Sequence, residues 1–190
     1  MGTLAGRPVR RELPQYFYRL PAHSQRTYLA SDAIERYSLA PSAAARALAA
    51  SLEHALEAAS LAQVGDATRA LAHELCRSFG VAAVPIEVRG ARPHNVRGEL
   101  HGVYYEPERR GAPGRIVLWM KTAKRHDVVK PRTFLRTLLH ELGHYFDYSL
   151  LGLYQSFHTH GFFKRESWLM NLLVAQSPTA TTESESPRTP

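Results

Sequence analysis

Residues 132–151 read RTFLRTLLHELGHYFDYSLL, and the spacing of their apolar side chains predicts an amphipathic helix. Pro131 suits the first turn of this helix and Gly152 suits its end. At about 100° per residue, the apolar side chains fall on one face, which is formed by Leu135, Leu138, Leu139, Leu142 and Phe146. The opposite face carries polar residues, namely Thr133, Thr137, His140, His144 and Asp147. We therefore expect the leucine face to pack in a core and the histidine face to be available for other roles.

His140, Glu141 and His144 form a His-Glu-x-x-His pattern within this helix. Histidines four residues apart point their imidazoles the same way, so both can bind one metal ion. Glu141 lies about 100° around the helix from His140, which suits contact with a metal-held water better than ligation. The pattern is typical of zinc hydrolases, with Zn²⁺ as cofactor, two histidine ligands and Glu141 as catalytic general base. Asp147, one turn further on, is expected to accept a hydrogen bond from a ligand imidazole.

The letters HEL occur a second time at residues 73–75, without a second histidine. Arg69 and Arg77 lie four residues to either side of His73, and their positive charges disfavour a bound dication there. We therefore expect His73 and Glu74 to lie on a charged, solvated helix face.

The rest of the chain predicts an α+β fold. Two helices are expected between residues 42 and 80, because Ser42 can cap the first, Gly65 breaks it and Asp66 can cap the second. Three β-branched and aromatic segments follow, VPIEVRG, ELHGVYYEP and GRIVLWMKTA, separated by Gly and Pro. They predict a small, mostly antiparallel sheet packed on the histidine-bearing helix and on one further helix after it.

A catalytic zinc site needs a third protein ligand and an open position. The segment after Gly152 offers His158, His160 and Glu166. His158 would lie just before a helix and on the same side as Phe162, whereas His160 would point away from Phe162. Spacing alone leaves both His158 and Glu166, which lies on that helix, as candidates for the third ligand.

The motifs HELGH at 140–144 and HTHGF at 158–162 together resemble the SprT-like branch of the minigluzincin-type zinc metallopeptidases. Proteins of that family have a small sheet, the His-Glu-x-x-His helix and a later helix whose N-terminal histidine completes the zinc site. An aromatic residue follows that histidine four positions on, as Phe162 follows His158 here. The resemblance therefore implies that His158 is the third ligand, and Glu166 is the alternative because related gluzincins use a glutamate on the following helix. The resemblance covers about residues 84–175, and the chain lacks the C-terminal zinc ribbon of cysteine pairs that some relatives have.

The resemblance implies a metallopeptidase domain over residues 83–176. Residues 14–82 lie outside the resemblance and are expected to form an N-terminal helical region. A mobile tail is expected over residues 1–13 and a disordered tail over residues 177–190, since neither holds enough apolar residues to build a core.

The same resemblance implies hydrolysis of a protein or peptide substrate. We expect the substrate to lie extended and antiparallel to the strand around residues 116–120. The alternative is a metal-stabilised binding module, associated with nucleic acid, that has little or no turnover. A deformylase-type hydrolase is disfavoured, because it needs a cysteine ligand and Cys76 lies in a helix beside Arg77.

Composition and charge limit the kinds of partner, metal site and cellular location that we expect. The net charge is +7, and basic clusters around residues 109–115 and 121–132 suit acidic partners, including non-specific contact with nucleic acid. The single cysteine excludes a disulfide framework and any multi-cysteine metal site. The N-terminal residues lack the apolar core of a signal peptide, and no apolar run approaches the ~18 residues of a membrane span. We therefore expect a cytoplasmic protein without membrane contact.

Overall fold

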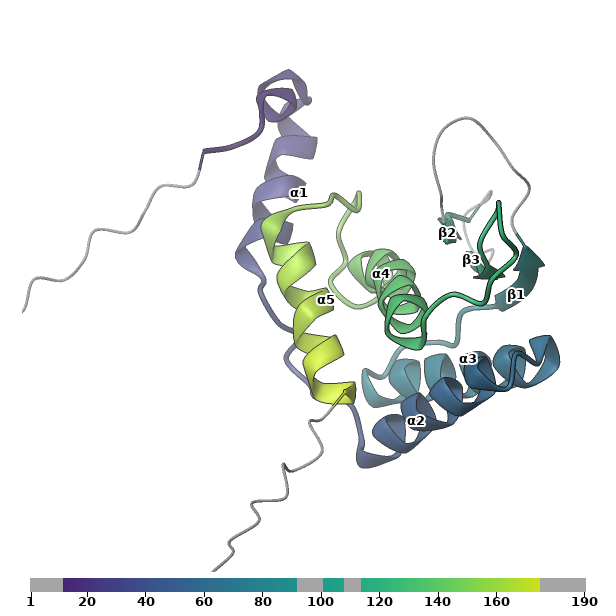
Figure 1. Ribbon diagram of the computed structural model, residues 1–190. Helices are drawn as coiled ribbons and strands as arrows, with labels where there is room; N and C mark the ends of the chain where they lie inside the picture. The colour runs from purple at the N-terminus through teal and green to yellow at the C-terminus, as the bar shows by residue number, and fades with distance from the viewer. Residues whose placement is uncertain (1–11, 92–100, 108–113, 175–190) are drawn as a thin grey trace, which may run out of the picture.

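The computed structural model describes residues 12–91, 101–107 and 114–174. These residues form an α+β fold, as predicted (Figure 1). Its elements in chain order are the 3₁₀ helix η1 (Gln15–Arg19), α1 (Ala22–Ala33), α2 (Ala43–Glu57), α3 (Leu61–Ser78), β1 (Ile86–Ala91), β2 (Gly102–Tyr105), β3 (Arg115–Lys121), α4 (Pro131–Ser149) and α5 (His160–Leu173). The disordered tail predicted at 177–190, and residues 1–11 of the predicted N-terminal tail, lie outside the described residues.

The three strands form a mixed sheet in the order β1-β3-β2. Strand β2 pairs with β3 antiparallel, as expected, whereas β1 pairs with β3 parallel. Strand β3 lies between the other two, and its residues 116–120 are buried in an unbroken run, as in strands that are covered on both faces. Both edges of β3 are therefore occupied, and the expectation that a peptide pairs with residues 116–120 is wrong.

Helices α2 and α3 are both capped by serine. The Ser42 hydroxyl accepts a hydrogen bond from Ala45 N at 3.3 Å, which confirms the first predicted cap. The second helix differs from the prediction: it begins at Leu61 after a Ser60 cap, and Gly65 is buried inside it. A glycine costs a helix only about 1 kcal/mol, so the Ser60 cap and the packing of α3 outweigh it.

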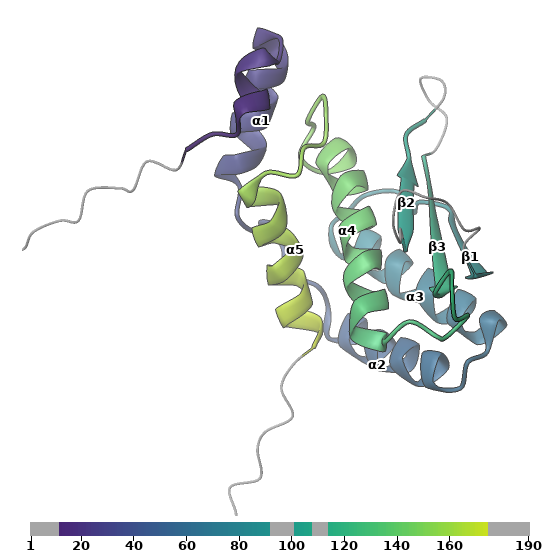
Figure 2. The same ribbon diagram turned by 45° about the horizontal axis from the view of Figure 1, so that its top comes forward.

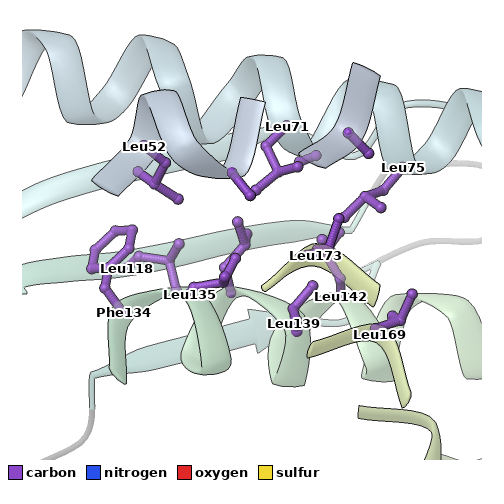
Figure 3. Packing of buried hydrophobic residues seen from close by; sticks show 14 of the residues in the cluster. Leu52, Leu71, Leu75, Leu118, Phe134, Leu135, Leu139, Leu142, Leu169 and Leu173 are labelled. Atoms are coloured by element: carbon purple, nitrogen blue, oxygen red, sulfur yellow. The ribbon is translucent and has the colours of Figure 1, made fainter. Parts of the chain in front are cut away.

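Helix α4 lies between α5 and the sheet, while α2 and α3 pack across one end of this arrangement (Figure 2). All five residues of its predicted leucine face are buried in one hydrophobic cluster. Figure 3 shows where α2, α3 and β3 meet α4 and α5 in this cluster. The labelled residues come from both sides of residue 82, namely Leu52, Leu71, Leu75, Leu118, Phe134, Leu135, Leu139, Leu142, Leu169 and Leu173. The helices before residue 82 thus share their core with the elements that carry the histidines.

Helix α1 packs along α5 on the side away from the sheet (Figure 1). The segment between α4 and α5 passes close to α1, since the rings of Tyr28 and Phe157 have centroids 5.6 Å apart. Among the described residues, none of the helices combines the length and apolar character that a membrane span requires.

Candidate metal centre

Three histidine side chains meet at one point beside α4. His140 and His144 lie one turn apart on α4, and His158 reaches them from the segment before α5. The Nε2 atom of His158 lies 2.9 Å from Nε2 of His140 and 3.1 Å from Nε2 of His144. The three ligands expected from the sequence are therefore brought together by elements far apart in the chain.

The remaining ring nitrogen of His140 has a charged partner. Its Nδ1 lies 2.9 Å from Oε2 of Glu166, and the other oxygen of that carboxylate accepts a hydrogen bond from Arg136 at 2.9 Å. A carboxylate only accepts, so Nδ1 carries the hydrogen and Nε2 of the neutral ring keeps its lone pair. Glu166 therefore lies on the side of His140 away from the other histidines, and it is not among the three residues that converge.

His144 is held in the same tautomer by a different partner. Its Nδ1 lies 2.7 Å from the Ser156 hydroxyl, which donates its own hydrogen to Oδ2 of Asp147 at 2.7 Å. Ser156 must then accept from Nδ1–H, and Nε2 of His144 again presents a lone pair to the cluster. Asp147 was expected to accept directly from an imidazole, but Ser156 lies between them.

Two of the three histidines, His144 and His158, have lowered pKa values and are therefore neutral at physiological pH. Burial lowers the pKa of His144 to about 3, and the neighbouring His140 and His158 add to this shift. Partial desolvation and His140 likewise lower the pKa of His158. Neutral rings with inward-facing lone pairs are the form in which histidine binds a metal.

Glu141 lines the same cleft from beneath β2. Its side chain is buried, and Oε2 accepts a hydrogen bond from the backbone N–H of Tyr104 at 2.7 Å. Burial raises the pKa of Glu141, while His140 and the Tyr104 N–H act in the opposite direction. The strand can pass this close only because Gly102 has no side chain: a Cβ there would lie 2.9 Å from Oε1 of Glu141.

Phe162 packs against all three histidine rings, with centroid distances of 5.0 Å to His140, 4.8 Å to His144 and 5.3 Å to His158. Its ring also lies over Gly143, where a Cβ would be 3.0 Å from Phe162 Cζ. The small residue between the two α4 histidines thus lets α5 approach closely.

The cleft in front of the histidines has a volume of about 310 Å³. Its lining includes Tyr104, Glu106 and Tyr148 on the side of the α4 C-terminus. A second hollow of about 450 Å³ shares His140 and Glu141 with it and extends toward the α4 N-terminus. Sequence reasoning missed Tyr148 and Ser156, although Tyr148 lies one helical turn after His144 and could have been found by that spacing.

The other histidine motifs do not join the cluster. His160 is the first residue of α5 and is not one of the three histidines that converge. His73 is exposed, as expected, but Glu74 is buried and bound to Arg77 and Ser42. Within the second HEL motif, Glu74 therefore connects α3 to Ser42, the N-cap residue of α2.

Comparison of this chain with family models, with curated proteins and with solved structures found no match in any of the three.

Proposed function

We propose that this chain is a zinc-dependent metallopeptidase in which His140, His144 and His158 bind Zn²⁺ and Glu141 is the catalytic base. The observation that carries the proposal is the convergence of three Nε2 atoms, two of them with lone pairs fixed inward, in a cleft that Glu141 also lines. The Glu141 carboxylate is buried and lines that cleft, which is a suitable place for a general base.

The donor set fits zinc in a catalytic role. Zinc binds imidazole nitrogen readily, and catalytic sites use three protein ligands with one position left open, whereas structural sites use four. Within the described part of the chain, three side chains form the group, and it opens into the cleft. This count favours turnover over a purely structural metal.

A bound zinc ion would supply Lewis acidity for water and for a substrate carbonyl. The Glu141 carboxylate would take a proton from the attacking water and return it to the leaving amine. Tyr148 also lines the cleft, and its hydroxyl donates to Glu106 at 2.6 Å. Burial and Glu106 raise the pKa of Tyr148, so it stays protonated and would turn this hydrogen toward the oxyanion of the reaction.

An extended peptide would bind along β2, which is an edge strand of the described sheet. The carbonyl of His101 accepts a hydrogen bond from β3, whereas the N–H of Tyr104 points to Glu141. Because the direction of the backbone N–H and C=O groups alternates along a strand, those of Gly102 and Tyr104 point away from β3 and toward the cleft. Main-chain pairing there would bring a scissile carbonyl to the histidines and Glu141.

The test compares wild type with Glu141→Gln, using Glu57→Gln on the exposed surface of α2 as the matched control. All three should bind one zinc, and only Glu141→Gln should lose cleavage of denatured casein. Cleavage by Glu141→Gln at the wild-type rate would refute the role of Glu141. Zinc binding without Glu141-dependent cleavage of any peptide would instead favour the metal-stabilised binding module.

A further inference from the structure

Helix α1 is hydrogen-bonded to the segment that carries His158. The Ser24 hydroxyl donates to Oε1 of Gln155 at 2.6 Å, and the Ser31 and Thr159 hydroxyls lie 3.2 Å apart in the interior. These bonds flank His158 on both sides in sequence. The N-terminal helix therefore contacts the metal-site segment directly, rather than only the far face of α5.

The end of α1 also touches the start of α5. Gly161 lies so close that an added Cβ would overlap the carbonyl oxygen of Ser31 and lie 2.6 Å from that of Asp32. Its N–H donates to the Asp32 carboxylate at 3.3 Å. Glycine at this position permits a backbone contact that fixes α1 and α5 relative to each other.

Arg165 connects this contact to the metal site. Its guanidinium is buried and donates to the carbonyl oxygens of Ser31 and Ile34, at 2.8 and 2.6 Å, on the α1 side. On the α4 side it donates to Oδ1 of Asp147 at 2.7 Å. Asp147 is fully buried, so its charge depends on this pairing.

We propose that Ser156 is a positioning residue for the ligand His144, and that Asp147 and Arg165, anchored on α1, orient its hydroxyl. The chain of bonds runs from α1 through Arg165 and Asp147 to Ser156, and ends at Nδ1 of His144. The proposal rests on the metal site of the proposed function and extends it to the N-terminal helix.

The role assigned to Ser156 concerns the tautomer more than the ring position. The Phe162 ring packs against the His144 ring with centroids 4.8 Å apart, a contact that does not involve Ser156. A neutral imidazole has two tautomers, and only the one with hydrogen on Nδ1 leaves Nε2 free to bind a metal. Without the Ser156 hydroxyl as acceptor, His144 could adopt either tautomer. Loss of such a hydrogen-bond partner of a ligand typically weakens metal binding about 10- to 100-fold.

The experiment uses the full chain as wild type, Ser156→Ala and Ser156→Thr, with Ser149→Ala as control. Ser149 is exposed and its hydroxyl donates only to the Tyr145 carbonyl in the same helix. Zinc affinity is measured by chelator competition, and the His144 tautomer by ¹⁵N NMR of the metal-free chain. Ser156→Ala should bind zinc about 10- to 100-fold more weakly and lose the pure Nδ1–H tautomer. Ser156→Thr should restore both, and Ser149→Ala should change neither.

Two results separate the inference from the proposed function. A wild-type chain that binds no zinc would refute the proposed function. Normal zinc binding with an unchanged affinity and tautomer in Ser156→Ala would refute the positioning role alone. The wild-type spectrum is decisive without any variant, because an Nε2–H tautomer at His144 would also overturn the inference.

Discussion

The Nδ1 atom of His140 lies 2.9 Å from Oε2 of Glu166, on the side of the ring opposite the other two histidines. Glu166 is thereby a hydrogen-bond partner of His140, and its second oxygen accepts a hydrogen bond from Arg136. His144 has an analogous arrangement, with Ser156 and Asp147 in place of Glu166 and Arg165 in place of Arg136. The acceptor at each α4 histidine is thus connected to an arginine, directly for Glu166 and through Asp147 for Ser156.

Replacing Gly102 by alanine should displace β2 from α4. The added Cβ would lie 2.6 Å from Thr137 Cγ2 and 2.9 Å from the Glu141 carboxylate, so the strand or the catalytic base must move. Overpacking of this kind costs about 1–3 kcal/mol, measured as the free energy of unfolding in urea, and peptidase activity should fall with it. Gly90→Ala is the control, because nothing lies within 4 Å of its Cβ position. Equal stability of the two variants would contradict the close approach of β2.

Tyr148→Phe should reduce kcat and leave zinc content unchanged. The hydroxyl lies in the cleft, donates to Glu106 and accepts a long hydrogen bond of 3.3 Å from the backbone N–H of Ser156. The Ser156 hydroxyl that faces His144 is not part of this contact, so the loss should act on the reaction rather than on the histidines. Loss of one oxyanion donor typically lowers kcat about 10²- to 10³-fold. Tyr154→Phe, at an exposed position, should have no effect on kcat. A Tyr148→Phe enzyme with wild-type kcat would remove this residue from the mechanism.

Stability of the metal-free chain should fall with acidification below pH 6.5. His144 has a pKa of about 3 in the fold, against 6.5 when exposed, so the unfolded chain binds this proton first. The contribution of His144 is therefore present above pH 6.5 and is lost progressively as the pH falls toward 3. The slope approaches about 1.4 kcal/mol per pH unit for one proton. Urea unfolding in the presence of a chelator measures it, and His144→Asn should lack this contribution. A free energy of unfolding that stays constant from pH 7 to pH 5 would contradict it.

The sequence was most informative where a helical period was strong. The leucine face of α4, the cap at Ser42 and the pairing of His140 with His144 each follow from spacing along one element or its end. The approach of His158 was expected from the resemblance of the two motifs to a known family. The helix break predicted at Gly65 is wrong. The low helix propensity of glycine counts for less there than the N-cap at Ser60 and the packing of α3.

Features that depend on pairing between distant segments were not accessible. The parallel pairing of β1 with β3 depends on which strand takes the centre, and only the buried run at 116–120 signals it. Similarly, Arg165 gave no sequence signal for burial, since arginine is normally exposed. Its partners Asp147 and Ser31 lie 18 and 134 residues away in the chain.

The most direct test of the account is the zinc content of purified, dialysed protein by elemental analysis. Wild type and His160→Ala should hold one zinc per chain, because His160 is outside the histidine group. Glu166→Gln should keep the site with lower affinity, whereas His158→Ala should lose it. Zinc in His158→Ala equal to that in wild type, or a wild-type chain that takes up no zinc, would contradict the account.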